Sequence, residues 1–272
     1  MSTAFGETLA AVQAELAARQ ARVPLADVKV KALAGPSPRD CLGVLRGNGV
    51  AVIAELAPSC PAKGAVADEY EQGGANVISV PVGLRRPGPS LRAMTDVRAR
   101  VNVPILCKSL IISSYQLWEA RAHGADLVQL IAAALEQEAL VSLIERAESI
   151  GLTPLVEVHD EGELLRSLAA GARAIAVNPR DLGTGEVDRT ALARLLPLVP
   201  DGTVRVAECG SAGRSDLIAC AKSGADAVLI GRSLLAGNNP RSAVAGLVAV
   251  GTHPALGRWR RQTAKPDPEP QY

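Results

Sequence analysis

Eight short apolar segments, rich in β-branched residues, alternate along this chain with segments of helical period. The apolar segments are Val50–Glu55, Asn76–Val80, Val103–Lys108, Asp126–Ile131, Thr153–Val158, Ala174–Asn178, Thr203–Cys209 and Ala227–Gly231. Continuous apolar runs are typical of parallel strands buried on both faces, and each parallel connection needs a crossover helix. The alternation therefore predicts an α/β fold, a (β/α)8 or TIM barrel, with a doubly wound open sheet as the alternative.

An internal repeat favours closure into a barrel. Four related segments recur at a spacing of about fifty residues, the kind of period that marks a repeated structural unit. They are Gly74-Ala75-Asn76, Gly124-Ala125-Asp126, Gly171-Ala172-Arg173 and Gly224-Ala225-Asp226. Each glycine stands where a helix must end in a left-handed cap, directly before a buried strand. The four segments precede predicted strands two, four, six and eight, so every second βα unit has the same joint.

The two ends of the chain differ from the repeating part. Residues 1–48 contain a helical segment at Glu7–Arg19 and several prolines, and we expect them to form a helical extension that caps the barrel. Residues 49–250 would form the barrel itself. Residues 251–272 are polar and Pro-rich, a composition that predicts a disordered tail.

Composition excludes several function classes. The 29 basic and 28 acidic residues leave a net charge of only +1, and aromatic residues make up 2% of the chain. Nucleic-acid binding is therefore not expected, because it needs a basic surface and often aromatic stacking platforms. No apolar run approaches membrane-spanning length, and the five scattered cysteines fit reduced thiols. We expect a cytoplasmic monomer or homodimer that acts on a small molecule.

Charged residues stand at the ends of alternate predicted strands. Glu55, Lys108, Glu157 and Glu208 end strands one, three, five and seven, and Asn178 ends strand six. Reactive groups of barrels lie at these carboxyl ends, and alternate strands contribute to one interior layer. One such charge fits a structural ion pair, but four at equivalent positions favour a reaction centre. A lysine among carboxylates keeps its proton and can act as a general acid, with a carboxylate as the base.

A second signal indicates a phosphate site. Small residues follow strands seven and eight at predicted helix N-termini, namely Gly210, Ser211, Gly231, Arg232 and Ser233. Backbone N–H groups in these two loops commonly bind phosphate in barrels, although each loop alone would also fit an ordinary glycine-rich turn. The sequence has no His/Asp cluster at metal-ligand spacing and no dinucleotide fingerprint, so we expect neither a metal nor a cofactor.

From about residue 7 to residue 250, these residues in this order resemble the indole-3-glycerol phosphate synthase family. The resemblance rests on Ala21-Arg22-Val23-Pro24-Leu25, Pro38-Arg39-Asp40, Val52-Ile53-Ala54-Glu55, Tyr115-Gln116, Glu119-Ala120-Arg121, Pro154-Leu155-Val156-Glu157-Val158, Val177-Asn178, Arg180-Asp181-Leu182 and Val206-Ala207-Glu208. That family closes the pyrrole ring of an anthranilate-derived 1-deoxyribulose 5-phosphate, with loss of CO2 and water. The resemblance thus implies a decarboxylating lyase.

The resemblance also implies roles for the strand-end residues. Lys108 is similar to the acid that promotes ring closure, and Glu157 to the carboxylate used in dehydration. Glu55, Asn178 and Glu208 match residues of the same site. Three further residues match the phosphate cradle, namely Gly210, Gly231 and Ser233.

The chain departs from the family pattern around this site. Ala57 stands where a second functional lysine is expected. From Lys63 to Tyr70 the loop and first helix are shorter than is usual in the family, where that loop acts as a mobile lid. Cys209 replaces a serine after strand seven, Leu110 replaces an aromatic residue after strand three, and Arg85-Arg86 replaces paired aromatics after strand two. Three hypotheses follow: a synthase or close paralogue, which we favour, a specialised-metabolism paralogue that acts on another phosphosugar adduct, and a non-catalytic barrel that binds a phosphorylated ligand.

Overall fold

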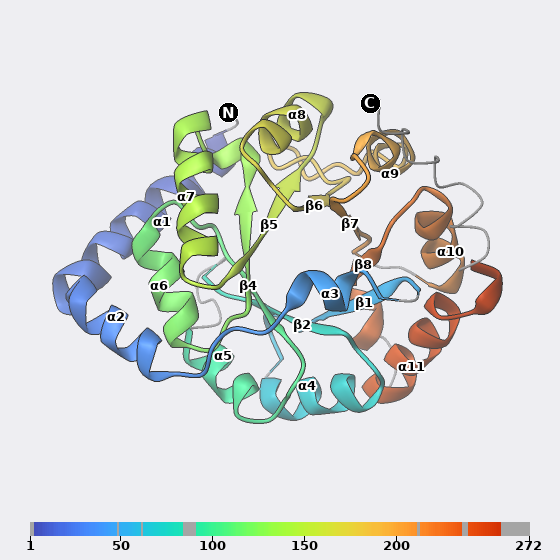
Figure 1. Cartoon of the computed structure of the whole chain (residues 1–272), viewed down its shortest axis with the longest axis horizontal. Helices are drawn as coiled ribbons and strands as arrows, with labels where there is room; N and C mark the ends of the chain where they lie inside the picture. The colour runs from blue at the N-terminus through green and yellow to red at the C-terminus, as the bar shows by residue number, and fades with distance from the viewer. Residues whose placement is uncertain are drawn as a thin grey trace, which may run out of the picture.

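A closed barrel of eight parallel strands forms the centre of the molecule (Figure 1). The computed structural model describes residues 3–47, 49–60, 62–83, 91–210, 213–235 and 239–256. The strands pair in sequence order, and β1 closes the ring by pairing with β8, with Val52 opposite Val228. The predicted (β/α)8 barrel is therefore confirmed, and the open sheet is excluded because β1 and β8 have no free edge.

The strands lie within two residues of their predicted ranges. They are β1 Ala51–Glu55, β2 Val77–Pro81, β3 Ile105–Lys108, β4 Leu127–Ile131, β5 Thr153–Val158, β6 Ala174–Val177, β7 Val204–Glu208 and β8 Ala227–Ile230. The helices that follow the strands surround the barrel (Figure 1). They are α4 Lys63–Gln72, α5 Leu91–Arg98, α6 Ser114–Ala122, η1 Ala132–Ala134, α7 Gln137–Ser149, α8 Glu161–Ala169, α9 Ala191–Leu195, η2 Leu196–Leu198, α10 Arg214–Lys222, η3 Arg232–Leu235 and α11 Pro240–Gly251.

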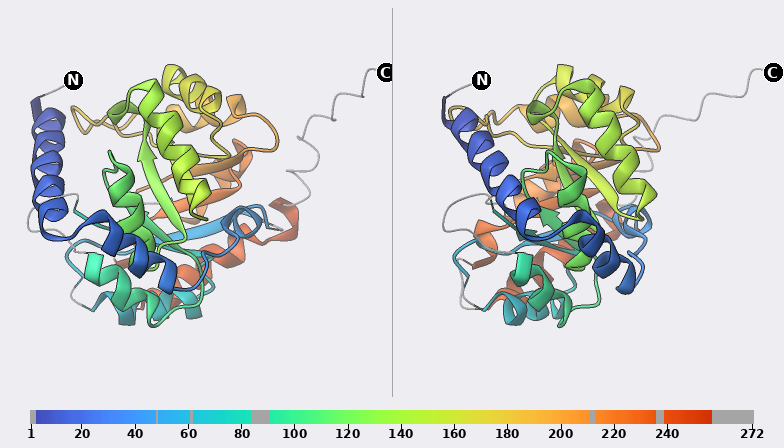
Figure 2. Two further views of the ribbon diagram at one scale, coloured as in Figure 1. Left: turned by 60° about the vertical axis from the view of Figure 1, so that its left-hand side comes forward. Right: turned by 90° about the vertical axis from the view of Figure 1, so that its left-hand side faces the viewer.

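The N-terminal extension has two different positions on the barrel. Its helices are α1 Thr3–Arg22, α2 Leu25–Ala34 and α3 Cys41–Leu45. Helices α1 and α2 lie along the outside (Figure 2), where Arg19 forms an ion pair of 2.9 Å with Glu119 of α6. Helix α3 places Cys41 and Leu45 against the apolar side chains inside the barrel. Only α3 therefore covers an end of the barrel, whereas α1 and α2 flank its side.

At the C-terminal end, ordered structure continues past residue 250. Helix α11 ends at Gly251, and the side chain of Leu256 packs against the core. The remaining residues of the predicted tail, 257–272, lie outside the described residues. In the part of the chain that the structure describes, none of the helices is long and apolar enough to cross a membrane.

Alternating side chains divide the buried residues between two cores. Ile53, Leu106 and Leu155 point into the barrel, where they pack with the two residues of α3. Their neighbours along each strand, such as Val52 and Val156, pack outward against the helices. Successive strand residues face opposite sides of a sheet, so each strand contributes to both cores. The inner core is apolar except toward the carboxyl ends of the strands.

The four repeated Gly-Ala segments that join a helix to the next strand have the predicted left-handed glycines. Three of them also make a hydrogen bond that the repeat did not predict. Gly74, Gly124, Gly171 and Gly224 have φ angles of 91°, 90°, 83° and 95°, in the left-handed region that favours glycine. The third residue of three joints accepts a hydrogen bond from a strand N–H group. The pairs are Asn76 with Val52 at 2.8 Å, Asp126 with Ile105 at 2.9 Å and Asp226 with Arg205 at 2.9 Å. The side chains of Asn76, Asp126 and Asp226 thus join neighbouring strands at the amino end of the barrel.

We expect Asp126→Ala to lower the free energy of unfolding by about 3–5 kcal/mol, because it leaves a buried cation without its partner. Asp126 is 2% exposed and accepts from Ile105 N–H, from Arg98 at 2.9 Å and from Arg39 N–H at 2.9 Å. Urea denaturation measures the change. Asp96→Ala on the exposed face of α5 is the matched control, with an expected change under about 0.5 kcal/mol. Equal stability of the two variants would contradict the structural role of this joint.

Candidate functional site

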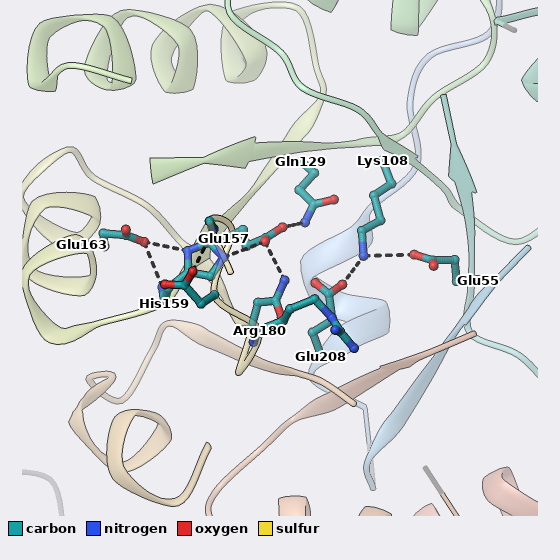
Figure 3. A network of polar contacts seen from close by, with 11 residues as sticks. Glu55, Lys108, Gln129, Glu157, His159, Glu163, Arg180 and Glu208 are labelled. Atoms are coloured by element: carbon teal, nitrogen blue, oxygen red, sulfur yellow. Dashed lines mark hydrogen bonds and ion pairs between the residues drawn. The ribbon is translucent and has the colours of Figure 1, made fainter. Parts of the chain in front are cut away.

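The interior of the barrel becomes polar where the strands end. Four of the five predicted catalytic residues lie there together in Figure 3, and the fifth, Asn178, donates a hydrogen bond to Glu157. Glu55, Lys108 and Glu208 are the last residues of β1, β3 and β7. Glu157 is the penultimate residue of β5, and Asn178 directly follows β6. Each continues the inward-facing alternation of its strand, which is why residues far apart in the sequence meet in one mouth.

Lys108 lies between two carboxylates. Its Nζ atom is 3.0 Å from Glu55 Oε2 and forms a hydrogen-bonded ion pair with Glu208 Oε1. The side chain is only 11% exposed, and burial alone would lower the pKa of Lys108. The charges of Glu208, Glu55 and Glu157 outweigh burial and raise this pKa above its ordinary value. Lys108 is thus an ammonium group at neutral pH, which suits a proton donor and opposes Schiff-base chemistry.

Glu157 is held as a carboxylate by three donors. Its Oε1 atom accepts from Asn178 Nδ2 at 2.7 Å and contacts His159 Nε2 at 3.0 Å, and Gln129 donates to Oε2. Burial alone would raise the pKa of Glu157, which is 2% exposed. The hydrogen bond from His159 and the nearby charge of Lys108 reverse this and hold the pKa below its ordinary value. An ionised, oriented carboxylate is a general base.

His159 belongs to this site, although no sequence pattern predicted it. Its Nδ1 atom and its backbone N–H lie 2.9 Å and 2.8 Å from Glu163 Oε2, so the imidazole bridges two carboxylates. Burial would lower the pKa of His159, but its hydrogen bonds to Glu157 and Glu163 raise it to about 10. The available signal was that His159 continues the inward alternation of Leu155 and Glu157.

The pKa of Glu208 shifts in the opposite direction from that of Glu157. Burial raises the pKa of Glu208 to about 7, the charges of Glu157 and Glu55 add to this effect, and Lys108 opposes it. Its Oε2 atom is buried and has no hydrogen-bond partner among the described residues. Two carboxylates whose environments move their pKa values in opposite directions are typical of an acid and base pair.

Two uncharged residues support the remaining carboxylate, Glu55. Ser79 Oγ lies 3.5 Å from Glu55 Oε2, and a Cβ atom at Gly231 would lie 3.2 Å from Glu55 Oε1. Glycine at position 231 therefore leaves room for the Glu55 side chain, in addition to the phosphate role that its loop predicts. Ser79 and Gln129 were missed because neutral polar residues inside apolar runs do not stand out in a sequence.

The two predicted phosphate loops lie next to each other. The backbone N–H of Arg232 donates to the carbonyl of Gly210 at 3.1 Å, and Gly210 has a φ angle of +40°. The Ser233 side chain is half-buried, whereas Arg232 is exposed. Ser211 lies outside the described residues. The N–H of Gly213 at the start of α10 donates to Asp216 at 2.8 Å. Two of the N–H groups that could bind an anion are thus already bonded within the protein.

The loop after β1 brings no lysine to the mouth. Ala57 is half-buried two residues after Glu55, and its carbonyl accepts the N–H of Cys60 at 3.0 Å. Lys63 is turned onto the loop itself, with its Nζ atom 3.0 Å from Pro58 O and 2.6 Å from Cys60 O. Within the described part of this loop, Lys63 is therefore not a substitute for the cation that Ala57 lacks. Arg85 and Arg86 lie outside the described residues.

Comparison with known proteins connects this geometry to a family. The family model for indole-3-glycerol phosphate synthase matches residues 6–247. The chain belongs to this family. The indole-3-glycerol phosphate synthase of Streptomyces griseus is 56% identical over 263 residues, covering 93% of this chain and 98% of the relative. The synthase of Beutenbergia cavernae is 52% identical over 264 residues, with the same coverage.

More distant solved structures share the fold. The 3-hexulose-6-phosphate synthase of Salmonella typhimurium has a TM-score of 0.61 at 16% identity and covers 74% of this chain and 99% of its own. The thiamine phosphate pyrophosphorylase of Pyrococcus furiosus has a TM-score of 0.59 at 17% identity and covers 76% and 96%. These likenesses support the barrel, whereas family membership identifies the chain as a decarboxylating lyase of the synthase type.

Because His159 has a raised pKa in the folded protein, we expect the free energy of unfolding to depend on pH. Its pKa is about 10 in the folded protein against 6.5 as the ordinary value, so the folded state binds more protons between these pH values. The free energy of unfolding should therefore fall as pH rises from ~6.5 toward ~10. His159→Gln should lower stability at about pH 6 by roughly 1.5–3 kcal/mol, the contribution of a charged hydrogen bond, and flatten the decline.

Urea denaturation of both proteins at several pH values measures this effect. His253→Gln is the matched control, since His253 is an exposed histidine near the C-terminal end of the described chain. A His159→Gln variant with an unchanged slope of stability against pH would show that His159 is not the titrating group.

Proposed function

We propose that this chain closes the pyrrole ring of an anthranilate-derived 1-deoxyribulose 5-phosphate, with loss of CO2 and water. The observation that carries the proposal is one mouth in which Lys108 is held as an ammonium group and Glu157 as a carboxylate. The names of relatives that are about half identical to this chain over most of its length support the same reaction. They favour the first of the three sequence hypotheses.

The two charged groups fit the two stages of the reaction. In ring closure, the aromatic carbon that bears the carboxylate attacks the ketone carbon, and Lys108 donates a proton to the oxygen that becomes a hydroxyl group. Loss of CO2 returns the bonding electrons to the aromatic ring. In dehydration, Lys108 is reprotonated by Glu208 and donates this proton to the hydroxyl, which leaves as water, and Glu157 accepts the proton lost from the adjacent carbon. Glu208, with its pKa of about 7, is suited to return a proton to Lys108.

The substrate phosphate would bind where the loops after β7 and β8 meet. Gly210, Ser211, Gly231, Arg232 and Ser233 form this proposed cradle. The N–H groups of Arg232 and Gly213 donate within the protein, so we assign phosphate binding chiefly to the serine hydroxyls and the exposed Arg232 side chain. The reaction as written uses no metal or cofactor. A monomer or homodimer in the cytoplasm remains our expectation for the assembly and location.

The proposal is tested by following indole fluorescence with the anthranilate-derived substrate. Lys108→Met should lower kcat by about 10²–10⁴-fold, because it removes the positioned acid. Lys222→Met, a substitution of the same kind on the exposed side of α10, is the control and should retain activity. Each substitution is made in the unmodified chain and in the Ala57→Lys variant, and kcat is measured for all of them. Circular dichroism verifies that each variant is folded. Unchanged kcat in Lys108→Met would overturn the assignment of the acid.

The alanine at position 57 leads us to expect slow turnover. Without the lysine that the family resemblance places there, the mouth lacks one cation for the phosphate and one proton source. We expect turnover of the usual substrate below the ordinary range that begins near ~1 s⁻¹. Ala57→Lys should raise kcat/KM but recover only part of it, since Leu110 and the shortened loop also depart from the pattern. Turnover of the unmodified chain within the ordinary range would make Ala57 a tolerated difference.

A further inference from the structure

Two cysteines meet beside the proposed site, in the layer between β7 and α10. Cys209 directly follows Glu208, and its side chain points away from the barrel interior toward α10, where Cys220 lies. Their Sγ atoms are 3.0 Å apart, and both thiols are free. A disulfide bond is roughly 2.05 Å long, so a shift of about 1 Å would join them.

We infer that Cys209 and Cys220 form an oxidisable dithiol site, which peroxide converts into an intramolecular disulfide between β7 and α10. In the first step a thiolate attacks one peroxide oxygen, the O–O bond breaks, and the departing hydroxide is protonated to water. In the second step the other thiol attacks the resulting sulfenic sulfur, an S–S bond forms, and a second water leaves. Two thiols and one hydrogen peroxide thus give one disulfide and two waters.

The surroundings distinguish this pair from the other buried cysteines. The hydrogen bond from Cys209 lowers the pKa of Cys220, which favours the reactive thiolate. Burial instead raises the pKa of both Cys41 and Cys107 to about 12, so these two are expected to stay inert. Cys220 is 4% exposed, whereas Cys209 is half-buried. A small oxidant would therefore reach the pair from the side of Cys209.

The bond would act on the loop that follows Glu208. That loop contains Gly210 and ends at Gly213, where α10 begins. Fixing its first residue to α10 would constrain the proposed phosphate cradle and the backbone of Glu208. This consequence rests on the proposed function, whereas the formation of the disulfide does not. We expect oxidation to lower kcat/KM reversibly, with recovery after addition of a dithiol reductant.

The test treats the purified full chain with hydrogen peroxide under denaturant-free conditions. Thiol titration after unfolding should count three thiols where the reduced protein has five, and a non-reducing peptide map should show Cys209 linked to Cys220. The disulfide would reduce the conformational entropy of the unfolded chain, but the segment that it closes, from Cys209 to Cys220, is short. The melting temperature should therefore rise by only roughly 5 °C. Cys209→Ser and Cys220→Ser should each lose no thiol pair and show no such rise, whereas Cys60→Ser should still form the bond.

The outcomes separate the site from its consequence. Retention of all five thiols, oxidation only to sulfinic acid, or linkage only between molecules through Cys60 would overturn the dithiol site. A Cys209–Cys220 disulfide with unchanged kcat/KM would overturn its effect on the phosphate loop. Because the thiol count needs no substrate, absence of synthase activity would bear on the proposed function and leave the dithiol result intact.

Discussion

The arrangement of the mouth depends on one buried ammonium group, Lys108 Nζ, which faces three carboxylates from different strands. Two opposite unit charges about 4 Å apart attract each other by about 4 kcal/mol at an effective dielectric constant near 20. Lys108 cannot neutralise all three, so the excess negative charge must be relieved elsewhere. At Glu157 it is relieved by His159 and two amide donors, and at Glu208 by a raised pKa. Different environments thereby shift the pKa values of two chemically similar side chains in opposite directions.

The barrel makes this concentration of charge possible because it supports the mouth from below and from outside. Ile53, Leu106 and Leu155 fill the interior beneath the charged layer, and α3 covers the opposite end. The hydrogen-bonded joints at Asn76, Asp126 and Asp226 connect neighbouring strands at the amino end. A packed interior resists local rearrangement, so the mutual positions of the strand-end groups are fixed before a substrate arrives.

The departures from the family pattern surround this acid and base set without removing it. Under the proposed function, Ala57 removes a cation that would bind the substrate phosphate. Cys209 places a thiol next to Glu208 and opposite Cys220. Both positions lie in loops that follow strands, where substitutions disturb the barrel least and alter function most. If the proposed site is correct, the chain combines a reaction centre of the family type with changed loops. These loops are where we expect its rate and its response to oxidants to differ from those of its relatives.

Much of the fold could be predicted from the sequence because it depends on local periodicity. The apolar runs predicted all eight strands, and the repeated glycines predicted four left-handed helix ends. The strand-end positions of Glu55, Lys108 and Glu208 were equally visible, since charges contrast with apolar runs. Neutral polar residues give no such contrast, which is why Ser79 and Gln129 were missed. The placement of α1 and α2 on the flank also escaped prediction, because an amphipathic helix does not specify which surface it will cover.

By itself, then, the sequence determined which residues carry charge and at which end of each strand they stand. Only the tertiary structure decided their protonation and partners. The pKa of a carboxyl group depends on burial and on charges a few ångströms away. Several of these neighbours come from distant strands: Glu208 is 100 residues from Lys108, and Gln129 is 28 residues from Glu157. The bridging role of His159 and the contact between Cys209 and Cys220 arise over shorter separations, between a strand end and the helix that follows it. They depend on how that helix packs back against its strand, which the residue types alone do not specify.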